Sequence, residues 1–284
     1  MSSSFASGVA PASILERIFA AKRAELEAER AITPLEEIRE AARRAPAPRD
    51  FLAALRAHRP AIIAEIKRAS PSKGDILPGL DPAALARDYA VSGAAAISVL
   101  TDRHFKGSLE DLRMVRAAVN RPLLRKDFIF DSYQLHQARV AGADCILLIA
   151  AMLKEADLHA LYAAARELGL QVLVEVHDED ELRAAGRAGA EIVGINNRDL
   201  HTFITDLALS ERLLQGYRGA ALIVSESGID TPEDLRRLDR AGARAFLIGE
   251  SLLRGGHPRQ KLEALCAALP DPASTACDPP RRAG

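Results

Sequence analysis

Beyond residue 60 the chain alternates between short apolar runs and longer stretches in which apolar residues recur three and four positions apart. The apolar runs, rich in Ile, Val, Leu and Ala, lie at 61–66, 95–100, 122–124, 144–150, 171–176, 191–195, 221–224 and 244–248. The stretches with helical spacing lie at 82–91, 109–119, 133–140, 156–168, 179–187, 207–214, 232–238 and 258–269. Short apolar runs predict buried strands, and a period near 3.6 predicts amphipathic helices. The pattern therefore predicts eight consecutive strand–helix units.

The order of these units predicts the fold. Strands that are apolar on both faces and joined by helical crossovers form parallel sheets. Eight such units within 284 residues favour a single α/β architecture, the closed (β/α)8 TIM barrel, over an open doubly wound sheet. The open sheet stays an alternative, but it would need a glycine-rich nucleotide loop after the first strand. The chain has Ser70-Pro71-Ser72 there instead.

About sixty residues precede the first predicted strand, and their pattern is helical. Helical signals occur at 14–19, at 34–37, where Pro34 is followed by two glutamates, and at 51–55. Proline and acidic residues are common in the first turn of a helix. The segment after residue 269 is rich in proline and small residues and has no periodicity, which is typical of disorder. The predicted organisation is a helical extension at 1–60 (its first ten or so residues loose), a barrel at 61–269 and a disordered tail at 270–284.

Composition narrows the function classes. Hydrophobic residues make up 48% and charged residues 27% of the chain, as in ordinary globular proteins. A formal net charge of −1 gives no overall attraction for nucleic acid or an anionic membrane, so neither is an expected partner. The three cysteines, Cys145, Cys266 and Cys277, fit neither a zinc site nor a disulfide framework. No secretory signal and no apolar run of about 20 residues is found. We expect a cytoplasmic protein; the sequence does not fix its oligomeric state, and a monomer is the simplest expectation.

The first predicted strand carries charge. Because side chains alternate between the faces of a strand, Ile63, Glu65 and Lys67 share one face. If both faces are covered, a carboxylate and an ammonium lie in the interior near the carboxyl end of the strand. Buried charges are costly unless they are paired. A purely structural ion pair is one interpretation, and a catalytic pair is the other.

Polar residues follow the other predicted strands as well, and TIM-barrel active sites lie at the carboxyl ends of the strands. The residues at these ends are Glu65, Lys67, Lys126, Glu175, Asn196, Arg198, Glu226, Ser227, Gly228 and Gly249. Each one alone could be a surface charge or a turn residue. Together they predict a mouth that holds two lysines, several carboxylates, an amide and a guanidinium.

Two further signals concern the ligand. Small residues follow the last two strands at Ser227, Gly228 and Gly249, where backbone N–H groups could bind a phosphate. Glu250 comes next, and we expect its side chain to point away so that its backbone alone contributes. Apolar residues near the same strand ends could line a slot for a flat ligand, although most such residues are ordinary core. These apolar residues are Phe105, Phe128, Leu147 and Leu200.

The segment from Ile63 to Gly74, with the sequence IAEIKRASPSKG, resembles the signature of the indole-3-glycerol phosphate synthase family. The resemblance extends through the segments LRKDF at 124–128, LVEVH at 173–177, GINNRDL at 194–200, SESGI at 225–229 and FLIGE at 246–250. It covers nearly the whole chain up to Leu269, including N-terminal helices that the family uses as a cap over the barrel mouth. Glu250 stands where some relatives carry a small residue.

The resemblance implies a reaction and roles. In this family 1-(2-carboxyphenylamino)-1-deoxyribulose 5-phosphate closes its indole ring with loss of CO2 and water, and no metal or redox cofactor takes part. It implies Lys126 as the acid, with a pKa depressed by a second lysine, and Glu175 as the base. Lys67 would hold the substrate carboxylate or phosphate and share the acid role. The remaining implied contacts are Glu65 and Asn196 with hydroxyls and lysines, Arg198 with negative charge, and Ser70, Ser227, Gly228 and Gly249 with anionic groups.

Two other functions fit parts of the pattern. A Schiff-base aldolase acting on a sugar phosphate also uses a lysine at a barrel strand end. A non-catalytic barrel that only binds a phosphorylated metabolite would bind this substrate without turnover. The paired acid and base residues argue against the non-catalytic barrel, and borohydride trapping with a ketose phosphate separates the aldolase from the synthase.

Overall fold

The computed structural model describes residues 14–70, 74–75, 79–199 and 202–269. The expectations of a loose N-terminal segment and a disordered C-terminal tail concern residues outside this set. Eight parallel strands close into a barrel in the order β1-β10-β9-β8-β7-β6-β5-β4, which confirms the predicted TIM barrel. The barrel strands are β1 (Ala61–Ile66), β4 (Ala96–Leu100), β5 (Leu123–Lys126), β6 (Cys145–Ile149), β7 (Gln171–Val176), β8 (Ile192–Asn196), β9 (Leu222–Glu226) and β10 (Ala245–Ile248).

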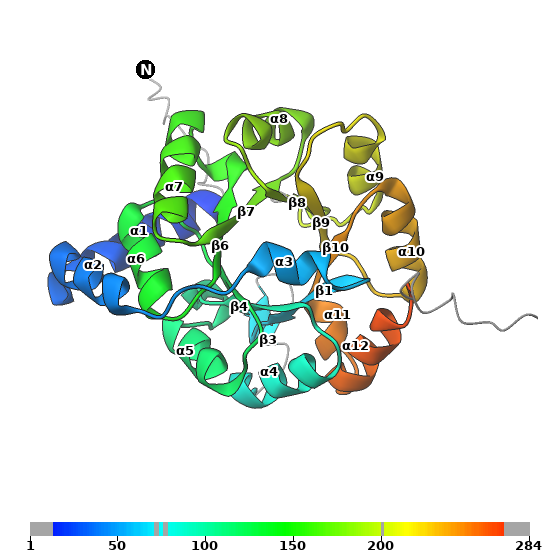
Figure 1. The fold of residues 1–284 in the computed structure, drawn as a ribbon, viewed down its shortest axis with the longest axis horizontal. Helices are drawn as coiled ribbons and strands as arrows, with labels where there is room; N and C mark the ends of the chain where they lie inside the picture. The colour runs from blue at the N-terminus through cyan, green and yellow to red at the C-terminus, as the bar shows by residue number, and fades with distance from the viewer. Residues whose placement is uncertain (1–13, 71–73, 76–78, 200–201, 270–284) are drawn as a thin grey trace, which may run out of the picture.

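Helices surround the ring of strands, as Figure 1 shows. The outer helices are α4 (Pro82–Val91), α5 (Leu109–Ala118), α6 (Ser132–Val140), α7 (Glu155–Glu167), α8 (Glu179–Arg187), α9 (Ala208–Gln215), α10 (Pro232–Ala241) and α12 (Pro258–Cys266). The shorter elements are a hairpin of β2 (Ala69–Ser70) and β3 (Gly74–Asp75), the 3-10 turns η1 (Arg103–Phe105) and η2 (Ala150–Met152), and α11 (Glu250–Leu253). Among the described helices, none combines the length and the apolar character that crossing a bilayer requires.

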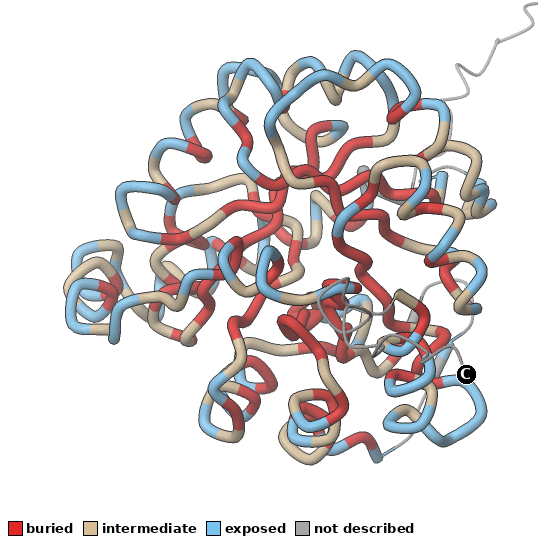
Figure 2. The backbone as a smooth tube through the Cα atoms, turned by 45° about the vertical axis from the view of Figure 1, so that its right-hand side comes forward, coloured by how far each residue is buried: buried red, intermediate tan, exposed pale blue. Residues whose placement is uncertain are grey.

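Two apolar cores lie on the two sides of the sheet. Along β1, Ile62, Ala64 and Ile66 pack in the larger core with the outer helices. Ala61 and Ile63 pack in a second core with inward-facing residues of the other strands. This alternation is the two-residue period of a strand. In Figure 2 the buried strands accordingly form the centre, and exposed residues lie on the outer side of the helices.

Three helices precede the barrel: α1 (Ile14–Ile32), α2 (Leu35–Arg44) and α3 (Phe51–Arg56). They lie at different places. Phe51 and Leu55 of α3 belong to the inner core together with Ala61 and Ala245, the first residues of β1 and β10. Helix α3 therefore closes the amino-terminal end of the barrel, and in Figure 1 it lies across the ring of strands.

Helix α1 reaches the other end, because Ile18 contributes to the cavity at the carboxyl ends of the strands. Helix α2 packs against α6 on the outside. The expected cap over the mouth is thus provided by α1, and α3 covers the opposite end. A division into units at residues 60 and 269 stays a prediction.

Candidate active site

A cavity of about 490 Å³ opens at the carboxyl ends of the barrel strands, within the usual size for a small-molecule site. Most of the predicted site residues line it, namely Glu65, Lys67, Phe105, Lys126, Phe128, Leu147, Glu175, Asn196, Arg198, Ser227, Gly228, Gly249 and Glu250. Leu200 lies outside the described residues. Ser70 belongs to β2, and its side chain is not among those described.

The strand period explains why the charged residues converge. Ile63, Leu124 and Leu173 face the inner core, and the residue two positions further along each strand faces the same way. Those residues are Glu65, Lys126 and Glu175. Each strand thus contributes an apolar layer deep in the barrel and a charged side chain at its mouth.

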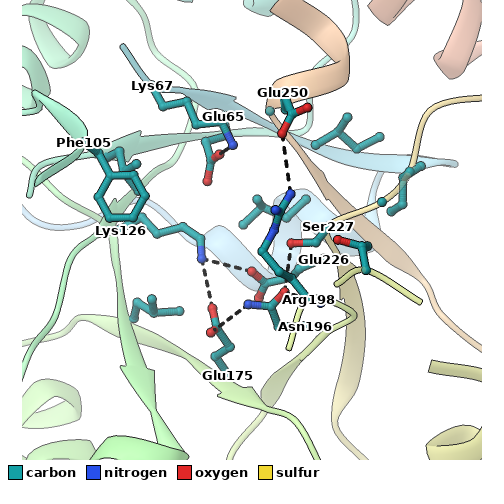
Figure 3. Close-up of a pocket in the computed structure, with 18 of the residues that line it drawn as sticks. Glu65, Lys67, Phe105, Lys126, Glu175, Asn196, Arg198, Glu226, Ser227 and Glu250 are labelled. Atoms are coloured by element: carbon teal, nitrogen blue, oxygen red, sulfur yellow. Dashed lines mark hydrogen bonds and ion pairs between the residues drawn. The ribbon is translucent and has the colours of Figure 1, made fainter. Parts of the chain in front are cut away.

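Lys126 lies at the centre of the charged group. Its Nζ is 3.0 Å from Glu175 Oε2 and 3.1 Å from Glu226 Oε2 (Figure 3). Burial alone would lower the pKa of the ammonium, but the attraction of Glu175, Glu226 and Glu65 outweighs burial and raises the pKa above the ordinary value of lysine. The expectation of a lysine depressed toward neutrality is therefore wrong, because carboxylates surround this amine.

Glu175 is held by three partners. Besides Lys126, Asn196 Nδ2 donates to its Oε1 at 3.0 Å, and His177 Nε2 lies 3.4 Å from the same oxygen. Burial would raise the pKa of Glu175, but Lys126, His177 and Asn196 bring it below its usual range. Glu175 is consequently ionised at neutral pH.

His177, to which the sequence assigned no role, is held by a second carboxylate. Its Nδ1 lies 3.2 Å from Glu181 Oε2. Burial lowers the pKa of His177, but Glu175 and Glu181 raise it to about 10. The ring is therefore an imidazolium at neutral pH, and its charge supports the ionised form of Glu175.

Glu226 is the second residue without an assigned role. It is buried, and burial together with repulsion from Glu175 raises its pKa to about 7 against the opposing attraction of Lys126. The side chain lies over Gly194 of β8, where a Cβ atom would overlap Glu226 Oε1. Glu226 is two residues beyond Val224 of the inner core. The sequence placed it at the mouth with the other strand-end residues but gave it no role of its own.

Asn196 connects the charged group around Lys126 to the neighbouring loops. Its Oδ1 accepts from Ser227 Oγ at 2.8 Å and from the backbone N–H of Arg198 at 3.1 Å. Ser227 and Gly228 have left-handed φ values of 64° and 80°. At Gly228 the space is also restricted, since a Cβ atom would crowd Thr205 Cγ2.

Lys67 and Glu65 form a pair of their own, with Nζ 2.9 Å from Oε1. The sequence placed both on the interior face, and both line the cavity. A Cβ atom at Gly249 would overlap the Glu65 carboxylate. The small residue after β10 is therefore required by the packing of Glu65, besides any role in binding an anion.

Glu250 differs from the expectation. Its side chain does not point away: Oε2 lies 3.5 Å from Arg198 and Oε1 lies 3.1 Å from Arg254, as Figure 3 shows for Arg198. The attraction between Glu250 and Arg198 holds the carboxylate toward the cavity. Arg198 therefore enters the cavity already paired with an acid.

The opposite wall is apolar. The rings of Phe105 and Phe128 have centroids 6.4 Å apart, and Leu147 and Ile18 also contribute. An apolar wall facing a charged group suits a ligand with one flat aromatic part and one polar part. Within the described residues, no group of three or more His, Cys, Asp or Glu side chains is arranged to hold a metal ion.

Comparisons with known proteins agree on the family. A family model described as indole-3-glycerol phosphate synthase matches residues 15–265. The indole-3-glycerol phosphate synthase of Roseiflexus sp. (strain RS-1) is 52% identical over 262 residues, covering 89% of this chain and 97% of the relative. That of Chromobacterium violaceum is 49% identical over 257 residues, with coverages of 89% and 97%.

Two solved structures with a similar fold are more distant in sequence. N-acetylmannosamine-6-phosphate 2-epimerase from Clostridium perfringens is similar with a TM-score of 0.57 and 15% identity, covering 72% of this chain and 90% of that chain. Thiamine phosphate pyrophosphorylase from Pyrococcus furiosus is similar with a TM-score of 0.55 and 15% identity, with coverages of 73% and 94%. At this identity the likeness concerns the fold alone. The extensive match to one family over most of the sequence decides the assignment, and the chain belongs to the indole-3-glycerol phosphate synthase family.

Proposed function

We propose that the chain closes the indole ring of 1-(2-carboxyphenylamino)-1-deoxyribulose 5-phosphate, releasing CO2 and water to give indole-3-glycerol phosphate. Membership of the family, at 52% identity to the Roseiflexus synthase, supports the activity. The observation that carries the mechanism is Lys126, held as an ammonium between Glu175 and Glu226 at the barrel mouth.

Ring closure needs an acid. The aromatic carbon that bears the carboxylate attacks the ketone carbon, and the ketone oxygen becomes an alkoxide that must be protonated. A protonated Lys126 can supply this proton by general acid catalysis. Glu175 and Glu226 fix the position of its Nζ, and the low exposure of the site strengthens these contacts.

Loss of CO2 returns the C–C bonding electrons to the aromatic system. Dehydration then needs an acid for the departing hydroxyl and a base for the proton that the ring system releases. Glu175 is ionised and can act as that base, and it lies 3.0 Å from Lys126. A proton taken up by Glu175 can therefore return to Lys126. Lys67, with Glu65 beside it, is positioned to bind the substrate carboxylate and to serve as a second acid.

The substrate's other parts match the remaining walls. Phe105, Phe128 and Leu147 would contact the aromatic ring. The backbones at Ser227, Gly228 and Gly249 would bind the phosphate, since consecutive main-chain N–H groups in such turns bind anions. Arg198 would exchange part of its contact with Glu250 for a substrate anion.

The Schiff-base aldolase is the competing enzyme class. It requires a neutral amine as nucleophile, whereas three carboxylates keep Lys126 protonated. Borohydride treatment with a ketose phosphate separates the two reactions. We expect no covalent adduct on Lys126 or Lys67, and an adduct would favour the aldolase.

One assay tests the proposal directly. The substrate is added to the protein without metal or nucleotide, and indole fluorescence is followed over time. The chain contains no tryptophan, so the product signal is not masked by the protein. We expect fluorescence to rise with the release of CO2. Binding without turnover would support the non-catalytic barrel and overturn the proposal.

A further inference from the structure

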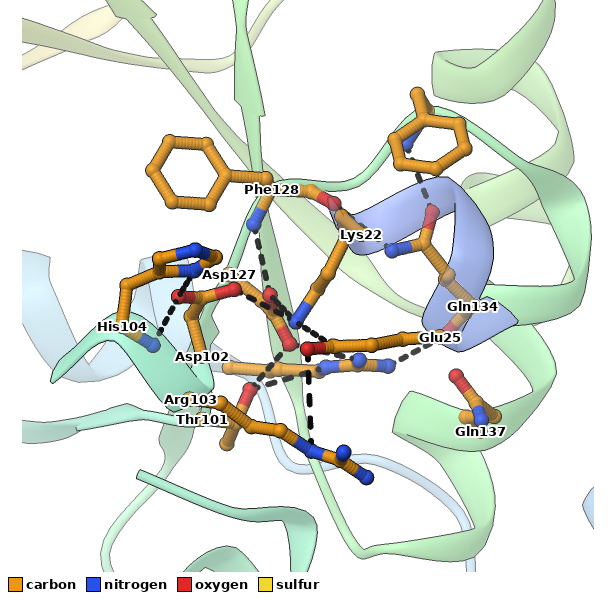
Figure 4. Close-up of polar contacts among 12 residues, drawn as sticks. Lys22, Glu25, Thr101, Asp102, Arg103, His104, Asp127, Phe128, Gln134 and Gln137 are labelled. Carbon is orange, nitrogen blue, oxygen red and sulfur yellow. Dashed lines mark hydrogen bonds and ion pairs between the residues drawn. The ribbon is translucent and has the colours of Figure 1, made fainter. Parts of the chain in front are cut away.

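Lys22 is a buried lysine on a helix that is not part of the barrel. It lies in the middle of α1, and the residue is 7% exposed. Its Nζ lies 2.8 Å from Asp102 Oδ2 and 2.7 Å from Asp127 Oδ1 (Figure 4). A lysine is rarely buried unless its charge is paired. Here one ammonium is shared by two carboxylates of the barrel, and Glu25 of α1 itself lies further away, at 3.6 Å.

The two aspartates belong to different strand ends, and each is fixed by further contacts. Asp102 follows β4 and accepts from the backbone N–H of His104 at 2.8 Å. Asp127 follows Lys126 directly and accepts from Arg125 at 2.8 Å and from Thr101 Oγ1 at 2.6 Å. Lys22 therefore connects α1 to two rigid points of the barrel mouth.

The cavity wall is built from the residues next to this connection. Ile18, one helical turn before Lys22, lines the cavity, as do Phe105 and Phe128, which follow the two aspartates. On a helix, residues four apart lie on the same face. The contact that holds Lys22 against the mouth thus also fixes where Ile18 lies relative to the two rings.

We propose that Lys22 is a positioning residue for substrate binding. By joining Asp102 and Asp127, it fixes α1 against the strand ends and sets the width of the apolar slot between Ile18, Phe105 and Phe128. This inference rests on the proposed function, in which that slot receives the aromatic ring of the substrate. Lys22 itself touches no reacting atom.

The test compares four proteins with the wild type: Lys22→Met, Ile18→Ala, the double variant, and Arg17→Met as control. Methionine keeps the length and apolar stem of lysine without its charge, and Arg17 is on the exposed side of α1. For Lys22→Met we expect KM to rise about tenfold with kcat changed less than about threefold, the signature of lost binding rather than lost chemistry. Arg17→Met should match the wild type.

The double variant separates positioning from general support of the fold. If Lys22 acts through Ile18, the two substitutions remove the same wall, and their effects on kcat/KM are not additive. Additive effects, or a lower melting temperature of Lys22→Met with unchanged KM, would overturn the inference.

If Lys22→Met does not fold, the variant Asp102→Asn tests the same contact. Asp102→Asn keeps an oxygen that can accept from His104, and it leaves Lys22 paired with Asp127. It should also raise KM, but by a smaller factor than Lys22→Met. An unchanged KM in Asp102→Asn counts against the inference. Wild-type protein that does not turn over the substrate contradicts the proposed function instead, so the two failures are distinguishable.

Discussion

The two carboxyl groups nearest to Lys126 have pKa values that are shifted in opposite directions. Glu175 and Glu226 lie at almost equal distances from its Nζ, yet the pKa of Glu175 is lowered and that of Glu226 is raised to about 7. The difference comes from their other neighbours, because Glu175 also has Asn196 and His177. Two acids whose pKa values are pushed apart are typical of a site that both accepts and donates protons.

Removing the central amine should abolish most of the activity. For Lys126→Met we expect kcat to fall at least about 10²-fold, because the alkoxide then lacks its acid, and a similar loss is expected for Glu175→Gln. Lys154→Met, at an exposed lysine, is the matched control. Steady-state kinetics measure kcat, and circular dichroism shows whether each variant is folded. Near-normal turnover in either site variant would contradict the assigned roles.

Glu226 should make stability depend on pH in a defined direction. Its pKa is about 7 in the folded protein against an ordinary 4.5, so the folded state keeps a proton that the unfolded chain has released. The stabilisation is complete below the unfolded pKa and is lost as pH rises through the folded pKa. The range from about pH 5 to about pH 8 spans most of this loss. Over that range Glu226→Gln should lose less free energy of unfolding than the wild type, by on the order of 2 kcal/mol.

Denaturant unfolding at the two pH values measures this difference. Glu175, whose pKa is lowered, stays ionised over this pH range in both proteins and therefore adds no pH dependence of its own. Glu167→Gln, at an exposed glutamate of α7, should follow the wild type. Equal pH dependence in wild type and Glu226→Gln would show that Glu226 is ionised in the folded state.

For single residues, the sequence predicts well which side chains come together and predicts poorly which of them are charged. Strand ends and the two-residue period bring Glu65, Lys126 and Glu175 to one mouth. The pKa of Lys126 depends on which carboxylates lie near it, and that follows from the register between the strands. Lys22 could not be identified, because the apolar spacing of a helix does not reveal where the helix docks on a barrel.

Three of the barrel strands end later than their predicted apolar runs. Strands β5, β8 and β9 extend to Lys126, Asn196 and Glu226, one or two residues beyond the predicted ends. Polar residues that face a barrel interior still pair in the sheet, so apolar character underestimates strand length. The hairpin β2–β3, the two 3-10 turns and α11 were not predicted, since elements this short show no periodicity.

Gly194 of β8 shows how one strand makes room for a buried carboxyl group of its neighbour. Gly194→Ala places a methyl group where Glu226 Oε1 lies, so Glu226 must move away from Lys126. We expect kcat to fall about tenfold or more, together with a lower melting temperature, since overpacking a core destabilises it. Gly186→Ala in α8, where a Cβ meets nothing within 4 Å, should instead stabilise by about 0.5–1 kcal/mol. Loss of stability without loss of kcat in Gly194→Ala would contradict this account.

In the whole molecule the ligand cavity lies at one end of the barrel, and a closely packed apolar core closes the other end. Helix α1 borders the mouth, and α3 fills the opposite end with Phe51, Leu52 and Leu55. In TIM barrels generally, the active site lies at the carboxyl ends of the strands, and the packing at the amino-terminal ends stabilises the fold. The sequence predicted the barrel and its helical extension, but it assigned the extension to one end, because a helical pattern carries no information about which end it covers.

This separation predicts the effect of a core substitution in α3. Phe51 is fully buried, and Phe51→Ala should reduce the free energy of unfolding by about 3–5 kcal/mol through the cavity that it leaves. KM and kcat at a temperature where the variant is folded should stay within about twofold of the wild type, because the active site lies at the other end. Denaturant unfolding and steady-state kinetics provide the comparison; a large change in KM would show that the two ends are coupled.

Because α3 plugs one end of the barrel, everything exchanged with solvent passes the same opening. Indole-3-glycerol phosphate then has to leave by the route through which the next substrate molecule arrives, and in the proposed function both use the same phosphate subsite. Accumulated product should therefore compete with the substrate for the free protein and act as a competitive inhibitor.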